Sequence, residues 1–277
     1  MAVELAVDPP QLRAGAKSAL SQDLATVSVL VRRDLLRFFR EKPRLVGALL
    51  QPLVFWLVIG MGFAPTFRLA GAEGLGYLEF FYPGIVLMVV LFAAIFTTMS
   101  VIDDRHEGFL QAVLVAPGSR TALVLGKVLG SSAVALAQGA LFLLLAPAAG
   151  FSLLAIGWPL LIASLTLVAI ALTATGFTLA WWLDSSSSYH VVMGMLLIPL
   201  WILSGAMFPA ARSVPMLAAV MKANPIAYAV DAMRLALYGQ AAPAALGLGT
   251  AWVDLAVVAL FAAVALGAAV TACHRSR

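Results

Sequence analysis

Long apolar stretches dominate this sequence. The segment 80–102, for example, carries no charged residue and stops abruptly at Asp103-Asp104-Arg105-His106-Glu107. A helix needs roughly 20 apolar residues to cross a bilayer core about 30 Å thick. Hydrophobic residues make up 63% of the chain and charged residues 11%, whereas soluble domains have about 45–50% and about 25%. The chain is therefore predicted to be an all-α membrane protein.

Six stretches of this kind are long enough to cross a bilayer, and each is expected to be one spanning helix. Their approximate limits are 45–63, 80–102, 128–149, 158–183, 191–208 and 252–273. Tryptophan is enriched at membrane interfaces, and it stands at several of these ends, namely Trp158, Trp181, Trp182 and Trp252. We therefore expect one transmembrane domain over 44–277, preceded by a flexible leader at 1–21.

The segment 22–43 is expected to form an amphipathic interfacial helix. Apolar residues recur there at the period of a helix, and Arg33, Arg37 and Arg40 fall on the opposite face. The apolar positions are Leu24, Val27, Val31, Leu35, Phe38 and Phe39. A helix of this kind lies along a membrane with its basic face near the lipid phosphates.

Lys and Arg are distributed unequally over this topology. With six spans and a cytoplasmic N-terminus, the outer segments hold only Arg68, Arg212, Lys222 and Arg234, and the other thirteen basic residues lie inside. This bias favours an inner (cytoplasmic) membrane protein with both termini in the cytoplasm. The basic residues flank apolar spans rather than forming a basic domain, so membrane lipid, and not nucleic acid, is the expected partner.

Few polar residues lie inside the predicted spans. Gln51, Gln138 and Thr175 are candidates to line a substrate route, although Thr in membrane helices commonly bonds its own backbone. The spans hold no Lys, Arg or paired carboxylates, which argues against an ion-driven pump. Asp254 is interpreted as an acid tolerated near a helix N-terminus. The three His residues and Cys273 are scattered, so no metal site and no nucleophile–base pair is predicted.

The connector 103–127 is the most informative segment outside the spans. Phe109, Leu110, Val113 and Leu114 recur at a spacing that predicts a short helix with a narrow apolar face. One interpretation is a helix that projects from the membrane to dock on a soluble partner. The alternative is a solvated connector whose charges only set the topology.

Several segments, in order, resemble a known family. The stretches 104–110 (DRHEGFL), 116–120 (APGSR) and 126–127 (GK) resemble the first cytoplasmic loop of type-2 ATP-binding cassette (ABC) permeases. That family includes the daunorubicin-resistance and lipo-oligosaccharide export permeases. The stretches 203–209 (LSGAMFP) and 224–234 (NPIAYAVDAMR) fit it as well. The sequence departs from the family pattern at His106, where a second acidic or basic residue is common.

The resemblance implies six spans, a dimeric pore and a separate ATPase chain docked on the cytoplasmic side. It implies a coupling segment with Leu110, Val113 and Leu114 buried against the ATPase and Arg105 and Glu107 at the rim. The full set of expected coupling residues is Asp104, Arg105, Glu107, Gly108, Phe109, Leu110, Val113 and Leu114.

The resemblance also implies an outer re-entrant or helical hairpin between 209 and 249 that caps the exit of the pathway. Its expected residues are Asn224, Pro225, Tyr228, Asp231 and Arg234. The alternative for this region is a surface helix on the outer leaflet without a gating role.

The chain lacks a phosphate-binding loop of its own. Gly126-Lys127 is followed by Val128 instead of Ser or Thr, and Thr121 stands where the first glycine of such a loop belongs. ATP and Mg are therefore expected to bind only through a partner ATPase, and the chain is expected to hold no cofactor and to be no enzyme.

The leading hypothesis is the permease subunit of an ABC exporter for an amphipathic or lipid-linked substrate, such as a drug, glycolipid or polysaccharide. A second permease subunit, identical or different, is the other expected partner. The alternatives are an integral membrane lipid-modifying enzyme and a non-energised channel or scaffold. The enzyme would require a cluster of His, Asp or Glu at one interface, and only 103–107 comes close.

Overall fold

All regular structure in the described part of the chain is helical. The computed structural model describes residues 19–68, 72, 74–115, 118–209, 213–239, 246 and 249–275. The helices are α1 (Ala19–Arg40), α2 (Lys42–Phe63), α3 (Tyr77–Thr98), α4 (Ser100–His106), α5 (Phe109–Val115), α6 (Arg120–Leu143), η1 (Ala146–Ala149), α7 (Trp158–Trp182), α8 (Ser186–Trp201), η2 (Ile202–Ala206), α9 (Pro215–Ala223), α10 (Pro225–Tyr238) and α11 (Ala251–Arg275).

Six helical segments in the described ranges are long and apolar enough to cross a membrane. They are Val46–Phe63, Tyr77–His106, Arg120–Leu143, Trp158–Trp182, Ser186–Ala206 and Ala251–Arg275. The prediction of an all-α membrane protein with six spans is confirmed. The third segment differs most from its expected limits, because it begins at Arg120 instead of 128 and ends at Leu143 instead of 149.

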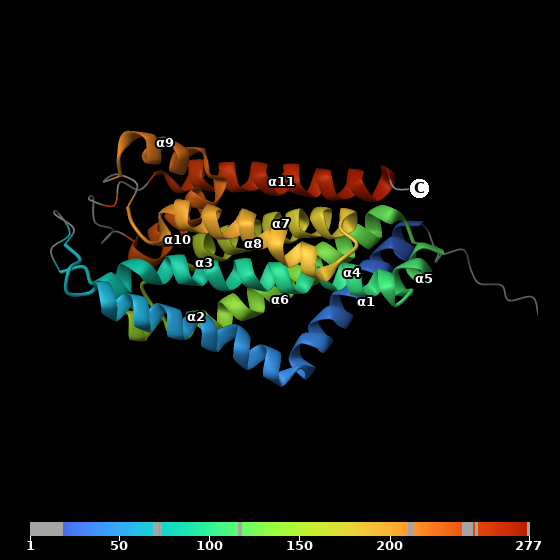
Figure 1. Cartoon of the computed structure of the whole chain (residues 1–277), viewed down its shortest axis with the longest axis horizontal. Coiled ribbons are helices and arrows are strands. Elements are labelled where there is room, and N and C mark those ends of the chain that lie inside the picture. Colours follow the sequence, from blue (N-terminus) through green and yellow to red (C-terminus); the bar gives the residue numbers. More distant parts are fainter. Residues whose placement is uncertain are drawn as a thin grey trace, which may run out of the picture.

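The helix α3 is the centre of the bundle. Its residues from Phe80 to Leu91 are all buried, and it packs against α2, α6, α7 and α8. In Figure 1, α3, α6, α7, α8 and α11 run lengthwise, whereas α2 slants away from them toward a sharp corner with α1. The span in α2 is only 17% buried, so an apolar helix face stays open on that side of the bundle.

The two ends of the bundle carry different elements. The helices α4 and α5, the start of α1 and the last turn of α11 lie at one end, here called the α5 end (Figure 1). The helices α9 and α10 lie at the opposite end, here called the α9 end (Figure 1). At the α5 end, Asp23 of α1 accepts hydrogen bonds from Ser119 N at 2.7 Å and Ser119 Oγ at 2.9 Å. Thr121 Oγ1 lies 3.1 Å from Nε2 of His274 in α11.

The helix α1 packs against α6 on a face that matches the predicted apolar face only in part, since Phe38 of that face is buried but other members of it are not. Leu30, outside the predicted apolar face, is only 2% exposed, whereas Leu24 and Phe39 of that face are exposed. A Cβ at Gly126 would lie 2.6 Å from Leu30 Cδ1, and one at Gly130 would lie 2.9 Å from Asp34 Oδ2. Since both positions are glycine, α1 approaches α6 closely and buries part of its polar face there.

Candidate functional site

The α5 end is built from a helix that breaks and turns back. The Tyr77–His106 segment passes from α3 into α4 at Met99, which is the C-cap of one helix and the N-cap of the other. The chain then reverses at Gly108, whose φ of +76° is strained for any residue with a side chain. The short helix α5 follows and lies beside α4. The predicted short helix in the connector is therefore present.

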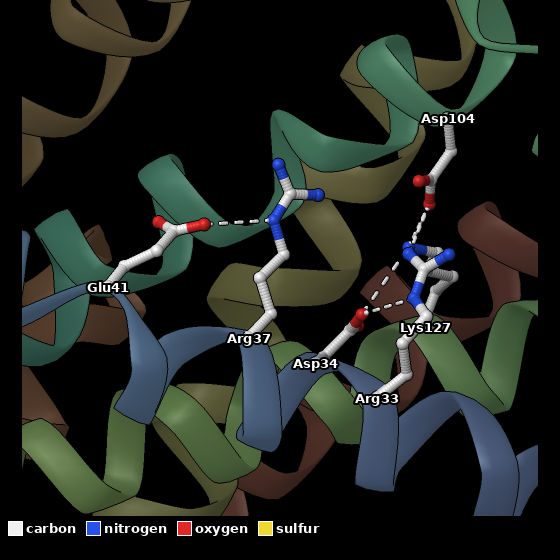
Figure 2. A network of polar contacts seen from close by, with 6 residues as sticks. All are labelled: Arg33, Asp34, Arg37, Glu41, Asp104 and Lys127. Atoms are coloured by element: carbon white, nitrogen blue, oxygen red, sulfur yellow. Dashed lines mark hydrogen bonds and ion pairs between the residues drawn. The ribbon is translucent and has the colours of Figure 1, made fainter.

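Four charged residues from three helices meet beneath this turn (Figure 2). Arg33 Nη2 of α1 donates to Asp104 Oδ2 of α4 at 2.6 Å, and Lys127 of α6 forms an ion pair with the same oxygen. Asp34 Oδ1 lies 3.3 Å from Arg33 Nε and 3.8 Å from Lys127 Nζ. Two positive and two negative groups thus form a neutral cluster, here called the charge cluster.

The burial of the charge cluster bears on two expectations from the sequence. Lys127 is only 1% exposed and Asp104 also 1%, and both lie within helical segments long enough to span a membrane. The expectation of spans without Lys, Arg or paired carboxylates applied to limits of 80–102 and 128–149, and the longer helical segments of the structure include Asp104 and Lys127. Arg33 was also expected to face lipid phosphates, but it binds Asp104 instead. Asp34 was missed altogether. Its one signal was an acid directly after Arg33 on an otherwise basic helix.

Arg105 connects α4 to the end of α7. Its guanidinium donates to the carbonyls of Ala180 at 3.2 Å and Trp181 at 2.6 Å and to Asp184 Oδ1 at 3.0 Å. The last carbonyls of a helix have no partner within the helix, so Arg105 supplies that partner here. The role of Arg105 at the rim of a docking surface stays a prediction, and the structure adds these contacts with α7 inside the chain.

The helix α5 presents one face inward and one outward. The Arg33 guanidinium carbon lies over the Phe109 ring, 4.0 Å from the ring centroid. Leu110 is only 3% exposed. Leu110 therefore packs into the chain's own core, which corrects the expectation that it would contact a partner. Val113 is partly buried against the same core, and the side chain of Leu114 lies outside the described residues. The exposed residues of the α4–α5 turn are His106 and Glu107, which precede α5, and Gln111 and Ala112 within α5.

The three polar candidates inside the spans have different surroundings. Gln51 of α2 faces an apolar cavity of about 170 Å³ between α2, α3 and α8, which Met88 and Trp201 also line. Gln138 is buried within α6. Thr175 donates to the carbonyl of Ala171 at 2.8 Å, which is the backbone bond common for Thr in membrane helices. Of the three, Gln51 is the one that borders an open space.

Asn224 and Tyr228 hold α10 at the α9 end. Asn224 caps α10 by accepting from Ile226 N at 3.0 Å, and its amide donates to Leu200 O of α8 at 2.6 Å. Pro225 follows at the first helical position, where its missing N–H costs nothing. Tyr228 donates to Lys222 O at 2.9 Å. These contacts fix α10 against both α9 and α8.

Arg234 is a buried cation at the α9 end. It is 2% exposed, donates to Gly205 O at 2.7 Å and lies over the Phe80 ring at 4.4 Å. Gly205 has a φ of +81° inside the π-helical turn η2, where the backbone carbonyl is free to face Arg234. Asp231 Oδ1 is 3.8 Å from Arg234 Nη1. Burial raises the pKa of Asp231 to about 6, an effect that Arg234 opposes, and burial lowers the pKa of Arg234.

No group of three or more His, Cys, Asp or Glu residues in the described ranges is arranged to hold a metal ion. The charge cluster pairs each carboxylate with a cation, and Asp103 Oδ1 accepts a hydrogen bond from Ser186 Oγ at 3.5 Å. The ion pairs of the charge cluster hold α1, α4 and α6 together.

Comparison with known proteins places this architecture in a family. A family model described as ABC-2 type transporter matches residues 25–238. The chain is 30% identical to the putative transport permease ycf38 of Cyanophora paradoxa over 211 residues, covering 74% of this chain and 72% of that protein. It is 27% identical to the daunorubicin resistance ABC transporter permease protein DrrB1 of Streptomyces coeruleorubidus over 259 residues, covering 91% and 88%. Nodulation protein J of Neorhizobium galegae is 24% identical over 231 residues, covering 81% and 86%. The chain therefore belongs to the ABC-2 type transporters, as a membrane subunit that takes part in transport and is not itself an enzyme.

Proposed function

We propose that this chain is the permease subunit of an ABC exporter that is driven by a separate ATPase docked at the α5 end. The observation that carries the proposal is the connection of α5 to the rest of the bundle. Through Asp104 the α4–α5 turn reaches α1 and α6, and through Arg105 it reaches α7. A displacement of α5 would therefore act on three other helices, α1, α6 and α7, at once.

The orientation rests on charge. Arg120 begins α6 and Arg275 ends α11 at the α5 end, and α1 carries Arg32, Arg37 and Arg40, whereas α9 and α10 at the other end carry only Lys222 and Arg234. Positive residues favour the cytoplasmic side. The α5 end is thus the cytoplasmic one in the cytoplasmic membrane, and it carries the start of α1 and the end of α11, which agrees with two cytoplasmic termini.

The docking face is the accessible side of α4 and α5. His106, Glu107, Gln111 and Ala112 are exposed there, and the apolar side of α5 is already occupied by Phe109 and Leu110 packing inward. A partner that holds this short helix in a groove would move it as a rigid body. ATP and Mg would act within that partner.

The substrate route runs along the open side of α2. Gln51 and Phe55 border the apolar cavity between α2, α3 and α8, and the exposed residues Leu50, Val54 and Val58 continue that surface along α2. A mostly apolar wall with one amide suits an amphipathic or lipid-linked cargo. The relative named for daunorubicin resistance supports a cargo of that class. A second permease subunit, identical or different, would close the open side.

Affinity purification from native membranes tests the ATPase docking. Wild type and an Ala112→Asp variant are compared with an Ala219→Asp variant, because Ala219 is an exposed alanine on α9 at the opposite end. We expect wild type and Ala219→Asp to recover an ATPase and Ala112→Asp to recover about tenfold less, since a buried unpaired charge weakens an interface. Equal recovery in all three would place the docking surface elsewhere. Transport without any ATPase would favour a channel.

A further inference from the structure

A cavity of about 220 Å³ lies at the α9 end, between α10, η2, α9 and the first turn of α11. Its charged lining comes from Asp231 and Arg234 of α10, Asp254 of α11 and Lys222 of α9. Tyr228 and Ser204 are among the other lining residues. The volume is several times the roughly 30 Å³ that one water occupies in the liquid, so it has room for a small polar group.

Asp254 is the unexplained residue of this cavity. Its side chain belongs to a residue that is 1% exposed, and its Oδ2 has no hydrogen-bond partner in the described structure. A buried carboxylate without a partner is costly unless a donor, a cation or a proton reaches it. Because Asp254 lines the cavity, that partner has space to enter.

The other charges of the cavity do not satisfy Asp254. Arg234 Nη2 is committed to Gly205 O at 2.7 Å, and its Nη1 lies nearest to Asp231, at 3.8 Å. Arg234 Nε has no hydrogen-bond partner. Lys222 is exposed at the edge of the cavity. Apart from the exposed Lys222, the charged lining consists of the half-buried Asp231, the buried Asp254 and the buried Arg234, so one carboxylate has no buried cation to match it.

We propose that this cavity binds a primary ammonium group carried by a polar headgroup, with Asp254 and Asp231 as the acceptors. An ammonium supplies several N–H donors and one positive charge, which meets both needs of Asp254. A quaternary ammonium supplies the charge without the donors, so it should bind less well. The ligand is either an aminolipid of the adjacent leaflet or a free amine. The proposal goes beyond the transport function and requires no ATPase.

Native mass spectrometry of the full chain in detergent tests the lipid source. Retention of phosphatidylethanolamine is compared with that of phosphatidylcholine, which has the same phosphate and a quaternary nitrogen. A second arm measures thermal stabilisation by glucosamine against glucose, a pair that differs by the amine. In at least one arm, we expect the probe with a primary ammonium (phosphatidylethanolamine or glucosamine) to bind about tenfold more tightly than its matched probe. A charge-assisted hydrogen bond would provide a difference of about that size. Preference in the first arm alone identifies a lipid ligand, and preference in the second alone identifies a free amine.

Variants assign the preference to this cavity. Asp254→Asn and Asp231→Asn should each remove it, and Asp184→Asn, whose side chain is 90% exposed on the connector near α4, should keep it. Asp254→Asn preserves shape and removes an unpaired buried charge, so its melting temperature should equal or exceed that of wild type. The proposal would be overturned if each primary-ammonium probe and its matched probe bound equally in both arms. A preference that persists in Asp254→Asn would also overturn it. The proposal would also fail if Ca²⁺ alone reproduced the stabilisation, because the ligand would then be a metal.

Discussion

Arg33 and Asp104 are 71 positions apart in the chain, and their side chains meet at 2.6 Å. Lys127 binds the same carboxylate oxygen from a third helix. The contact therefore joins α1, α4 and α6 at the α5 end, directly behind the helix that we propose as the docking element. Its four charges sum to zero, so the buried Asp104 and Lys127 and the less buried Arg33 and Asp34 leave no net charge there.

Removal of Asp104 should strongly destabilise the fold. In Asp104→Asn, Lys127 keeps its charge in a site that is only 1% exposed and loses its nearest carboxylate. Breaking a buried pair on one side typically costs about 3–5 kcal/mol. The measurement is thermal unfolding of the purified chain in detergent.

Two further variants serve as controls for the charge cluster. Arg37→Gln breaks an exposed pair with Glu41 and should cost no more than about 1 kcal/mol. The double variant Asp104→Asn/Lys127→Met leaves Arg33 paired with Asp34 and should recover part of the lost stability. If Asp104→Asn were as stable as Arg37→Gln, the charge cluster would not be what joins these helices.

Gly126→Val should separate α1 from α6. A Cβ at this position would already lie 2.6 Å from Leu30 Cδ1, so valine would force the helices apart at a typical cost of about 1–3 kcal/mol. Gly267→Val is the matched control, because nothing lies within 4 Å of a Cβ there. The unfolding temperature should fall in the first variant only, and Leu30→Ala in the Gly126→Val background should restore part of it. A similar loss in both variants would indicate a general effect of replacing glycine.

Asp231 should give the stability a pH dependence in the acidic range. Burial raises the pKa of Asp231 to about 6 from an ordinary value of 3.8, and Arg234 opposes the shift. The folded chain thus binds this proton more tightly than the unfolded chain. The stabilisation is fully present below about pH 4 and is lost as the pH rises through about 6.

The corresponding measurement is the difference in melting temperature between wild type and Asp231→Asn at several pH values. The difference should become less favourable to wild type as the pH rises from 4 to 6.5. Asp184→Asn controls for the loss of an exposed carboxylate. A difference that stays constant over this range would show that Asp231 does not titrate there.

Arg105→Lys should loosen the last turn of α7. The guanidinium donates to three carbonyls and to Asp184 at once, and the single ammonium of a lysine cannot reproduce this set of hydrogen bonds. Hydrogen exchange of a peptide that covers 178–184 should become about tenfold faster, in line with the loss of a hydrogen bond to a charged group. Arg32→Lys, an exposed substitution on α1, is the control. Unchanged exchange in Arg105→Lys would remove Arg105 from the proposed transmission to α7.

Hydropathy was sufficient to locate six membrane helices, because their length and apolarity are local properties of the sequence. The start of α6 shows where this approach fails. A hydropathy argument treats Lys127 as an unpaired charge and so begins the span after it, whereas Asp104 and Asp34 neutralise Lys127 inside the helix. Those partners are distant in sequence, and no local pattern indicates them.

The sequence motifs located the candidate site, but they did not indicate in which direction its side chains point. An apolar stripe on a short helix does not say whether a partner or the chain itself covers it, and Leu110 proved to face inward. Asp254 was interpreted as an acid favoured at a helix N-terminus. Its unpaired Oδ2 and the cavity beside it depend on α10 and η2, which pack there only in the folded chain.

The neutrality of the charge cluster also has an evolutionary consequence. Arg33, Asp34, Asp104 and Lys127 balance one another in a nearly dry site, so a change at one position should be accepted only with a compensating change at another. Among relatives of this chain, positions 104 and 127 should therefore lose their charges together. Relatives that keep an acid at 104 should keep a base at 33 or 127, and this covariation can be checked in any sufficiently large set of sequences.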